Sequence, residues 1–63
     1  MKNYTFEELE KGKLYQDCEG YYIFKGMRNE YIAGFEEVQF DYNDEIVKTG
    51  EEIYRTKTEL RFE

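Results

Sequence analysis

The chain has 63 residues, with 15 acidic and nine basic side chains, seven tyrosines, five phenylalanines, one cysteine and no histidine. A chain of this length forms one domain, residues 1–63, and buries only about 60% of the surface that its unfolded form exposes. A single cysteine excludes an intramolecular disulfide, and the lack of histidine excludes an ordinary structural zinc site. We therefore expect dense aromatic packing or oligomerisation to supplement a small core.

The first predicted element is a short helix near the amino terminus. Thr5 and Glu8 have the spacing of a capping box, and Tyr4 and Leu9 occupy the positions of a hydrophobic staple. Gly12 then ends the helix. At about six residues this helix is too short to be stable alone, so we expect it to pack on the rest of the domain.

The rest of the chain predicts short strands separated by turns and by a polar loop at residues 26–30. Alternating patterns and apolar runs predict strands at residues 14–17, 21–25, 31–35, 37–42, 45–48 and 51–62, with turns at residues 19–20, 43–44 and 49–50. In the strand at residues 37–42 we expect one set of side chains to point inward, namely Val38, Phe40 and Tyr42. The outward set is then Glu37, Gln39 and Asp41.

These elements predict a mainly β fold of about five strands, a small antiparallel barrel or curved sheet with one short N-terminal helix. The pattern L-x-x-G-K-x-Y-x-D-x-x-G-x-Y-x-F-x-G runs from Leu9 to Gly26. It resembles the opening hairpin of small SH3-like proteins, many of them encoded by bacteriophages and other mobile elements. Because the pattern consists of turn glycines and core aromatics, the resemblance implies an SH3-like barrel and says nothing of activity.

Negative charge is concentrated in one segment, residues 36–52, which we call the acidic segment. It holds seven carboxylates and one cation, Lys48, and so accounts for the whole net charge of −6. A local field of this kind predicts a basic protein partner. The candidate partner-binding residues are Glu36, Glu37, Asp41, Tyr42, Asp44, Glu45, Glu51 and Glu52. The alternative is that the segment is only a solvated face with its turns.

No catalytic or cofactor signature is present. The chain has neither histidine nor serine, so Ser-His-Asp and Cys-His arrangements cannot form. Cys18 lies between Asp17 and Glu19 and has no histidine to activate it, so we interpret it as a structural or incidental thiol and not a reactive one. No glycine-rich phosphate-binding loop occurs. We expect no enzyme activity and no cofactor.

Two further patterns are interpreted as structural. The acidic segment matches the ligand spacing of a calcium-binding EF-hand loop at Asp41, Asn43, Glu45 and Glu52, but Ile46 stands where that loop needs glycine. The final predicted strand sets Arg55, Lys57 and Arg61 on one face. We favour cross-strand pairing of this face with Glu37 and Asp41 over contact with nucleic acid, because the chain as a whole is negative.

Small, acidic, aromatic-rich chains without active sites are similar in style to phage and mobile-element inhibitors of host nucleases, including anti-CRISPR proteins. We expect a non-enzymatic protein-binding module whose acidic face occupies the basic, nucleic-acid-binding surface of a host enzyme, with Tyr42 or Tyr31 as an anchor. The alternative is a self-assembling, homo-oligomeric β-barrel with a structural or adaptor role, formed by pairing of edge strands. The absence of a long apolar run or a signal peptide predicts a cytoplasmic protein that binds no membrane.

Overall fold

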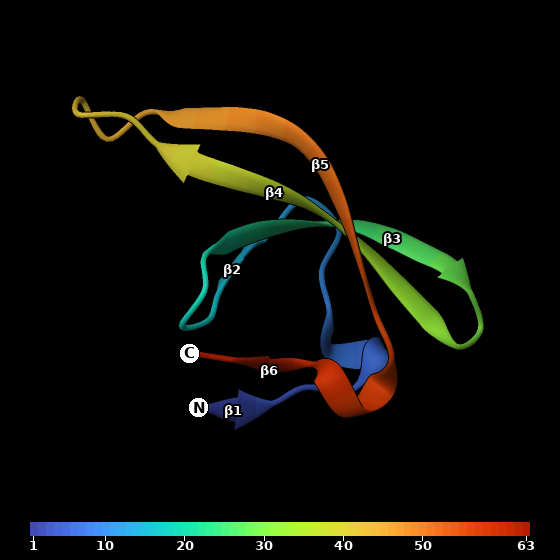
Figure 1. Cartoon of the computed structure of the whole chain (residues 1–63). Coiled ribbons are helices and arrows are strands. Elements are labelled where there is room, and N and C mark those ends of the chain that lie inside the picture. The colour runs from blue at the N-terminus through green and yellow to red at the C-terminus, as the bar shows by residue number, and fades with distance from the viewer.

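The computed structural model describes all 63 residues and is mainly β, with two antiparallel sheets (Figure 1). The larger sheet has the order β2-β3-β4-β5, formed by Leu14–Gln16, Tyr21–Asn29, Ile32–Phe40 and Ile46–Arg55. The smaller sheet pairs β1 (Lys2–Asn3) with β6 (Arg61–Phe62). The larger sheet is strongly curved, and the smaller sheet lies below it, close to both termini (Figure 1). The mainly β, antiparallel prediction is confirmed, but the sheets do not close into a barrel and the strands number six.

The core fills the space between the curved sheet and the smaller one. Its eight members are Leu9, Tyr15, Tyr22, Phe24, Ala33, Phe35, Leu60 and Phe62. Five of these are aromatic, and their rings meet edge-on or tilted, as do Phe35 and Phe62 with centroids 5.5 Å apart. Each such ring buries a large apolar area, so a few residues suffice to exclude water. The expected aromatic packing is confirmed.

The turn between β2 and β3 is held by Asp17, which is buried. Its Oδ1 accepts the backbone N–H groups of Glu19 at 2.8 Å and Gly20 at 3.0 Å, and its Oδ2 accepts a hydrogen bond from Arg55 Nη2 at 2.9 Å. Burial is the largest single influence on the Asp17 pKa and raises it. The two N–H groups and the Arg55 guanidinium together outweigh burial and lower the pKa below its ordinary value.

Arg55 also stacks on the aromatic core. Its guanidinium lies over the ring of Tyr22 at 4.9 Å from the centroid and over Phe62 at 5.6 Å. Its partner in the ion pair is Asp17, so the predicted pairing of Arg55 with Glu37 and Asp41 was wrong. The reason is that Arg55 lies on the core side at the end of β5, where the chain leaves the sheet.

The predicted N-terminal helix is only a 3-10 turn, η1 (Phe6–Glu8). The capping box is present, because Glu8 Oε1 accepts the Thr5 N–H at 2.9 Å, and this hydrogen bond holds the pKa of Glu8 below its ordinary value. The turn ends because Leu9 adopts extended backbone and buries its side chain in the core. The helix prediction was therefore wrong in type, although its start signal was right.

Two predicted breaks in the sheet were also wrong. The predicted loop at residues 26–30 is mostly strand, because β3 continues to Asn29, with a bulge beside Gly26. The predicted turn at residues 49–50 is a bulge within the continuous strand β5, where Gly50 has a φ of 83°. Residues 27–30 and 49–50 are exposed to solvent, so they lack the apolar pattern that would mark a strand in the sequence.

The long final strand that we predicted at residues 51–62 is interrupted. Strand β5 ends at Arg55, a second 3-10 turn, η2 (Lys57–Glu59), follows, and β6 begins at Arg61. A second capping box causes the break: Glu59 Oε1 accepts both the Thr56 N–H at 3.0 Å and the Thr56 hydroxyl at 2.9 Å. The change of direction carries Leu60 and Phe62 under the curved sheet, where they complete the core.

Replacing Thr56 with alanine is expected to lower the free energy of unfolding by about 0.5–1 kcal/mol, because the hydroxyl that donates to Glu59 Oε1 is lost while the Thr56 N–H still donates to it. The matched control is Lys57→Ala, since Lys57 is the exposed next residue and forms no ion pair; its effect should stay below about 0.5 kcal/mol. Urea denaturation of both variants tests this. Equal midpoints for the two variants would show that the cap contributes nothing.

Strand β4 presents its apolar side chains differently from the prediction. Val38 pairs with Tyr21, the neighbour of core-facing Tyr22, so Val38 lies on the outer face of the sheet and is buried there, outside the main core. Phe40 shares that outer face and is 37% exposed, whereas Tyr42 is 95% exposed. The inward prediction for Tyr42 was wrong, because this residue lies beyond the end of β4 and past the core.

No helix in the structure is long and apolar enough to span a membrane.

Candidate functional site

A two-stranded arm projects from the curved sheet. Strand β3 begins at Tyr21, which pairs with Val38, so the part of β4 beyond Val38 has β5 as its only neighbouring strand. We define the arm as residues 38–48, from the Val38–Lys48 pair to the tip. In Figure 1 it extends at the upper left, away from the smaller sheet and the core. The arm is thus the part of the molecule most open to a partner.

The tip of the arm is fixed by Asp41. Its Oδ1 accepts the backbone N–H groups of Asn43 at 2.8 Å and Glu45 at 3.0 Å, and its own N–H donates to the Glu45 carbonyl at 3.0 Å. Asp44 adopts a φ of 60°, a left-handed conformation that aspartate tolerates better than most residues. Asp41 and Asp44 therefore shape the turn in addition to contributing charge. The predicted turn at residues 43–44 is confirmed.

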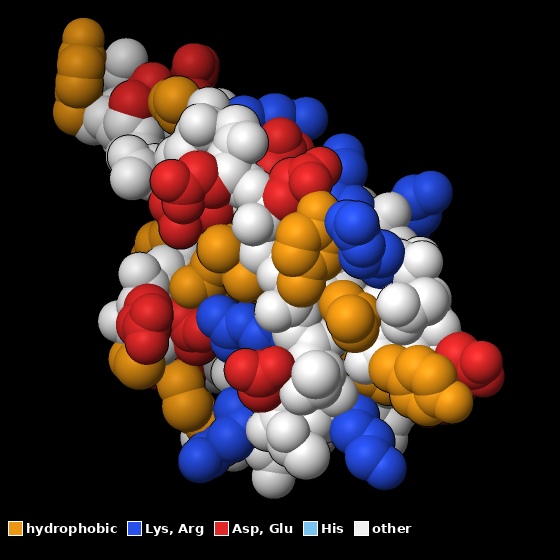
Figure 2. All heavy atoms as spheres, turned by 45° about the vertical axis from the view of Figure 1, so that its right-hand side comes forward, with side chains coloured by type: hydrophobic (Ala, Val, Ile, Leu, Met, Phe, Trp, Pro, Cys, Tyr) orange, Lys and Arg blue, Asp and Glu red, His pale blue; other side chains and the backbone are white.

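The charge of the acidic segment is largely uncompensated. Glu36 alone forms ion pairs, with Lys48 Nζ at 3.5 Å and Lys25 Nζ at 3.7 Å, and its Oε1 is buried without a hydrogen bond. The other six carboxylates of the segment have no Lys or Arg nitrogen within 4.0 Å. Figure 2 shows acidic side chains gathered over the projecting end of the molecule, with a hydrophobic side chain at the extremity.

The structure divides the predicted site residues into three groups. Asp41, Tyr42, Asp44 and Glu45 lie at or beside the tip of the arm. Glu36, Glu37 and Glu52 lie at its base, where Glu36 pairs with Glu52 across β4 and β5. Glu51 lies in the bulge beside Gly50, exposed to solvent. The segment is therefore one continuous hairpin, but only its outer half projects from the fold.

A shallow groove runs between the base of the arm and the β2–β3 turn. It has a volume of about 410 Å³ and is lined by Glu19, Gly20, Tyr21, Glu37, Val38, Gln39, Phe40 and Asp44. Three carboxylates and two aromatic rings line it, without any Lys or Arg; the rings of Tyr21 and Phe40 meet edge-on at 4.8 Å. Carboxylates attract a cation, and aromatic faces bind the same cation through their negative quadrupole. This groove suits a single lysine or arginine side chain.

Sequence reasoning missed Glu19 and the aromatic wall of this groove. Glu19 lies outside the acidic segment and reaches it only because the β2–β3 turn folds beside β4. The sequence shows the turn at Glu19–Gly20, but the groove also needs the pairing of Tyr21 with Val38. That pairing requires a register that the sequence pattern does not determine.

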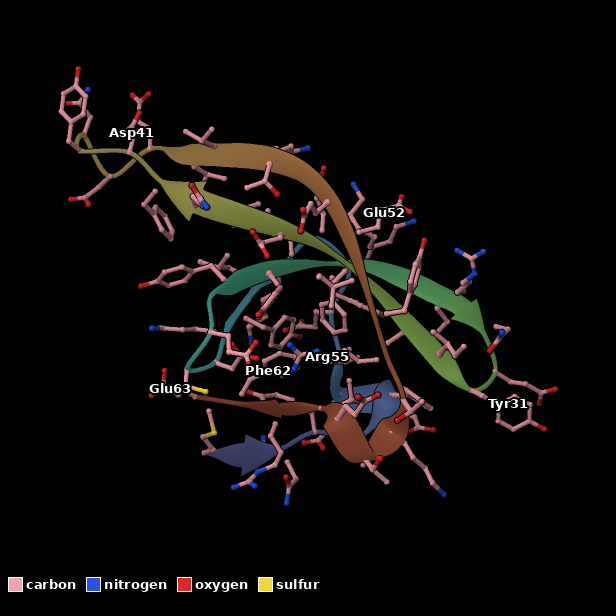
Figure 3. All side chains as sticks on the ribbon, viewed as in Figure 1. Tyr31, Asp41, Glu52, Arg55, Phe62 and Glu63 are labelled. Atoms are coloured by element: carbon pink, nitrogen blue, oxygen red, sulfur yellow. The ribbon has the colours of Figure 1, made fainter.

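The two predicted anchor tyrosines lie far apart. Tyr42 lies beside the acidic tip of the arm, whereas Tyr31 lies at the β3–β4 turn, at the opposite end of the sheet from Asp41 (Figure 3). Tyr31 is 71% exposed and lines a second groove of about 500 Å³ together with Phe6, Glu30, Thr56, Lys57 and Thr58. Only Tyr42 can therefore act together with the acidic residues.

The remaining chemical candidates are dispersed. Glu52 lies on β5 opposite Glu36, well along the strand from Asp41, so the EF-hand spacing does not form a loop around one point. No group of three or more His, Cys, Asp or Glu side chains is arranged to hold a metal ion. Cys18 is exposed in the β2–β3 turn. The arm and the groove at its base are thus the strongest candidate site.

Comparison with known proteins returned no match to a protein-family model, a curated protein or a solved structure. The function is therefore argued from the geometry and electrostatics of the arm.

Proposed function

We propose that this chain is a non-enzymatic protein-binding module whose acidic arm occupies a basic, nucleic-acid-binding surface of a host enzyme. The observation that supports it most is the placement of uncompensated charge. Six carboxylates without a cation within 4.0 Å lie on a hairpin whose outer half projects from the core. A projecting group of negative charges can enter a basic cleft and accelerates the encounter with it.

The arm combines charge with apolar contact surface. Tyr42, Ile46 and Val47 are exposed by 95%, 47% and 46%. Exposed aromatic and aliphatic side chains supply buried area once a partner covers them, and tyrosine is enriched in such interfaces. In this proposal Tyr42 is the apolar anchor at the tip, and the groove beside Glu37 receives a lysine or arginine side chain of the partner.

The biological setting of this proposal comes from the overall character of the chain. Small, acidic, aromatic-rich chains without active sites are similar in style to phage and mobile-element inhibitors, which favours an inhibitor of a host nuclease or a related enzyme, acting in the cytoplasm. The curved antiparallel sheet is compatible with an SH3-like origin. The second candidate, a self-assembling module, is favoured by the free edge of β5, which has β4 as its only neighbouring strand.

Reversing three carboxylates of the acidic segment should abolish partner binding and leave the fold intact. We choose Glu37→Lys, Glu45→Lys and Glu51→Lys together, because none of these side chains forms an ion pair and Asp41, which holds the turn, stays in place. Immobilised wild-type protein should retain a basic nucleic-acid enzyme from a bacterial lysate, and both salt and duplex DNA should release it. The triple variant should bind at least about tenfold more weakly.

The matched control reverses three exposed carboxylates outside the acidic segment, with Glu7→Lys, Glu30→Lys and Glu63→Lys. Both variants change the net charge by the same amount, so only the position of the charge differs. Retention of the enzyme by the control and its loss from the acidic-segment variant would support the proposal. Equal retention by both variants, or release by salt without competition from DNA, would defeat it.

A further inference from the structure

Strand β5 has a free edge along its whole length. In the order β2-β3-β4-β5 it is the last strand, and its only neighbour is β4. The opposite edge of this sheet, at β2, is short and is met by the Glu63 N–H, which donates to the Gln16 carbonyl at 2.7 Å. The outer edge of β5 therefore has no neighbouring strand on either side of the bulge at residues 49–51, where the Glu51 N–H donates to Thr49 Oγ1 at 3.3 Å. Such an edge is a template for pairing with another strand.

The sequence of β5 has a two-fold pattern of chemical types about Gly50. On either side of this glycine the order is polar, charged, apolar and apolar: Thr49, Lys48, Val47 and Ile46 in one direction, and Glu51, Glu52, Ile53 and Tyr54 in the other. An antiparallel pair of identical strands centred on Gly50 would set Lys48 opposite Glu52. The same pair would join Val47 to Ile53 and Ile46 to Tyr54.

In the structure, the two members of each of these pairs lie on the same face of the sheet. Lys48 pairs with Val38 and Glu52 with Glu36, and residues 36 and 38 lie on one face of β4. Between these two pairs β4 has one residue and β5 has three, so the bulge adds two residues to β5. Because two is an even number, Lys48 and Glu52 still point to the same face. Partners across an antiparallel pair must share a face to interact.

We propose that two copies of this chain form a dimer by antiparallel pairing of their β5 strands, in the register that sets Lys48 opposite Glu52 of the second copy. Charge complementarity selects this register. Moving the centre by one residue toward the N-terminus sets Ile46 opposite Glu52, and moving it by one residue toward the C-terminus sets Glu51 opposite Glu51. The first leaves apolar side chains opposite charge, and the second brings like charges together.

The dimer covers apolar side chains that the single chain leaves exposed. Ile46 and Tyr54 are 47% and 44% exposed on the outer face, and Val47 is 46% exposed on the other face. In the dimer they meet Tyr54, Ile46 and Ile53 of the second copy. The two-fold axis runs perpendicular to the sheet, so both copies curve toward the same side and form one continuous sheet. This inference does not depend on the proposed function: the dimer covers Ile46 and Val47 of the arm, whereas Asp41, Tyr42 and Asp44 at the tip stay free for a partner.

A charge-swap experiment tests the register. The variant Lys48→Glu carries acidic side chains at both positions 48 and 52, and the variant Glu52→Lys carries basic ones at both. Each homodimer then holds two repulsive pairs, whereas a mixed dimer of the two variants holds two attractive pairs. Sedimentation velocity from micromolar to millimolar concentration should show a wild-type dimer, at least about tenfold weaker self-association of each variant, and dimer formation on mixing.

Circular dichroism of each variant checks that it is folded, and recovery of the dimer on mixing is itself evidence that both chains are intact. A wild-type protein that stays monomeric over the whole concentration range would overturn the proposal. So would variants that dimerise as the wild type does, or a mixture in which the dimer does not return. Partner binding is measured separately with the triple variant of the acidic segment, so failure here leaves the proposed function untouched.

Discussion

Replacing Phe62 with alanine is expected to remove about half or more of the protein's free energy of unfolding. Phe62 is fully buried, and its ring lies 5.2 Å from that of Tyr15, 5.5 Å from Phe35 and 5.9 Å from Tyr4. Truncation of a buried phenylalanine lowers the free energy of unfolding by about 3–5 kcal/mol. A domain of this size has only about 3–9 kcal/mol in total.

Urea denaturation followed by circular dichroism measures this loss. Phe62→Leu keeps most of the apolar volume and should fall between the wild type and Phe62→Ala. Tyr42→Ala is the matched control, because it removes an aromatic ring that is 95% exposed and should change stability by less than about 0.5 kcal/mol. If Phe62→Ala were as stable as Tyr42→Ala, the core described above would be wrong.

Replacing Asp17 with alanine should be almost as damaging. The Asp17 side chain is 8% exposed and the Arg55 side chain 18%, so the substitution leaves a guanidinium largely buried without its carboxylate. Removing one partner from a buried ion pair costs about 3–5 kcal/mol. Two backbone N–H groups in the β2–β3 turn also lose their acceptor. Thermal and urea unfolding of Asp17→Ala measure the combined effect.

The reciprocal variant separates charge from geometry. Arg55→Lys keeps the positive charge but loses the planar group that stacks on Tyr22 and donates to the Glu59 carbonyl at 3.2 Å. It should therefore recover only part of the stability lost in Arg55→Ala. Full stability in Arg55→Lys would show that charge alone matters at this position.

The same ion pair predicts an acid-sensitive step in stability. The Asp17 pKa is lowered in the folded state from its ordinary value of 3.8, so the ionised carboxylate stabilises the fold at every pH above that value. This contribution is lost as the pH falls through the lower, folded-state pKa. Glu8 and Glu59 have lowered pKa values as well, so the informative comparison is with Asp17→Asn, whose stability should fall less between pH 5 and about 2. Parallel curves for the two proteins would contradict this assignment.

The sequence predicts the sheet well where side chains must alternate between core and water. Tyr22 and Phe24 in β3 and the turn after Asp17 were found because burial and turn chemistry act locally. The end of β5 was missed although Thr56 and Glu59 repeat the capping box that was recognised at Thr5 and Glu8. The alternation of residues 51–62 continues through Thr56 and Glu59 and predicts a strand there. The capping box at the same two residues predicts a helical turn, and the structure follows the capping box.

The candidate site was predictable in its charge and not in its shape. The concentration of carboxylates in residues 36–52 is a property of the sequence alone. The projection of the arm depends on where β3 starts relative to β4, which only the Tyr21–Val38 register determines. The groove that joins Glu19 to Glu37 depends on the same register, and so does the neutralisation of Glu36 by Lys25, from β3.

The pairing of Lys2 with Phe62 joins segments separated by almost the whole length of the chain. Contacts of such large sequence separation form late, because the entropy of closing the intervening loop must be lost before they contribute. The hairpin of β4 and β5, closed by the five-residue turn at Asp41–Glu45, needs no such closure. We therefore expect folding in the range of milliseconds to seconds. The β4–β5 hairpin, which includes the arm, should form before β1 pairs with β6 and completes the core.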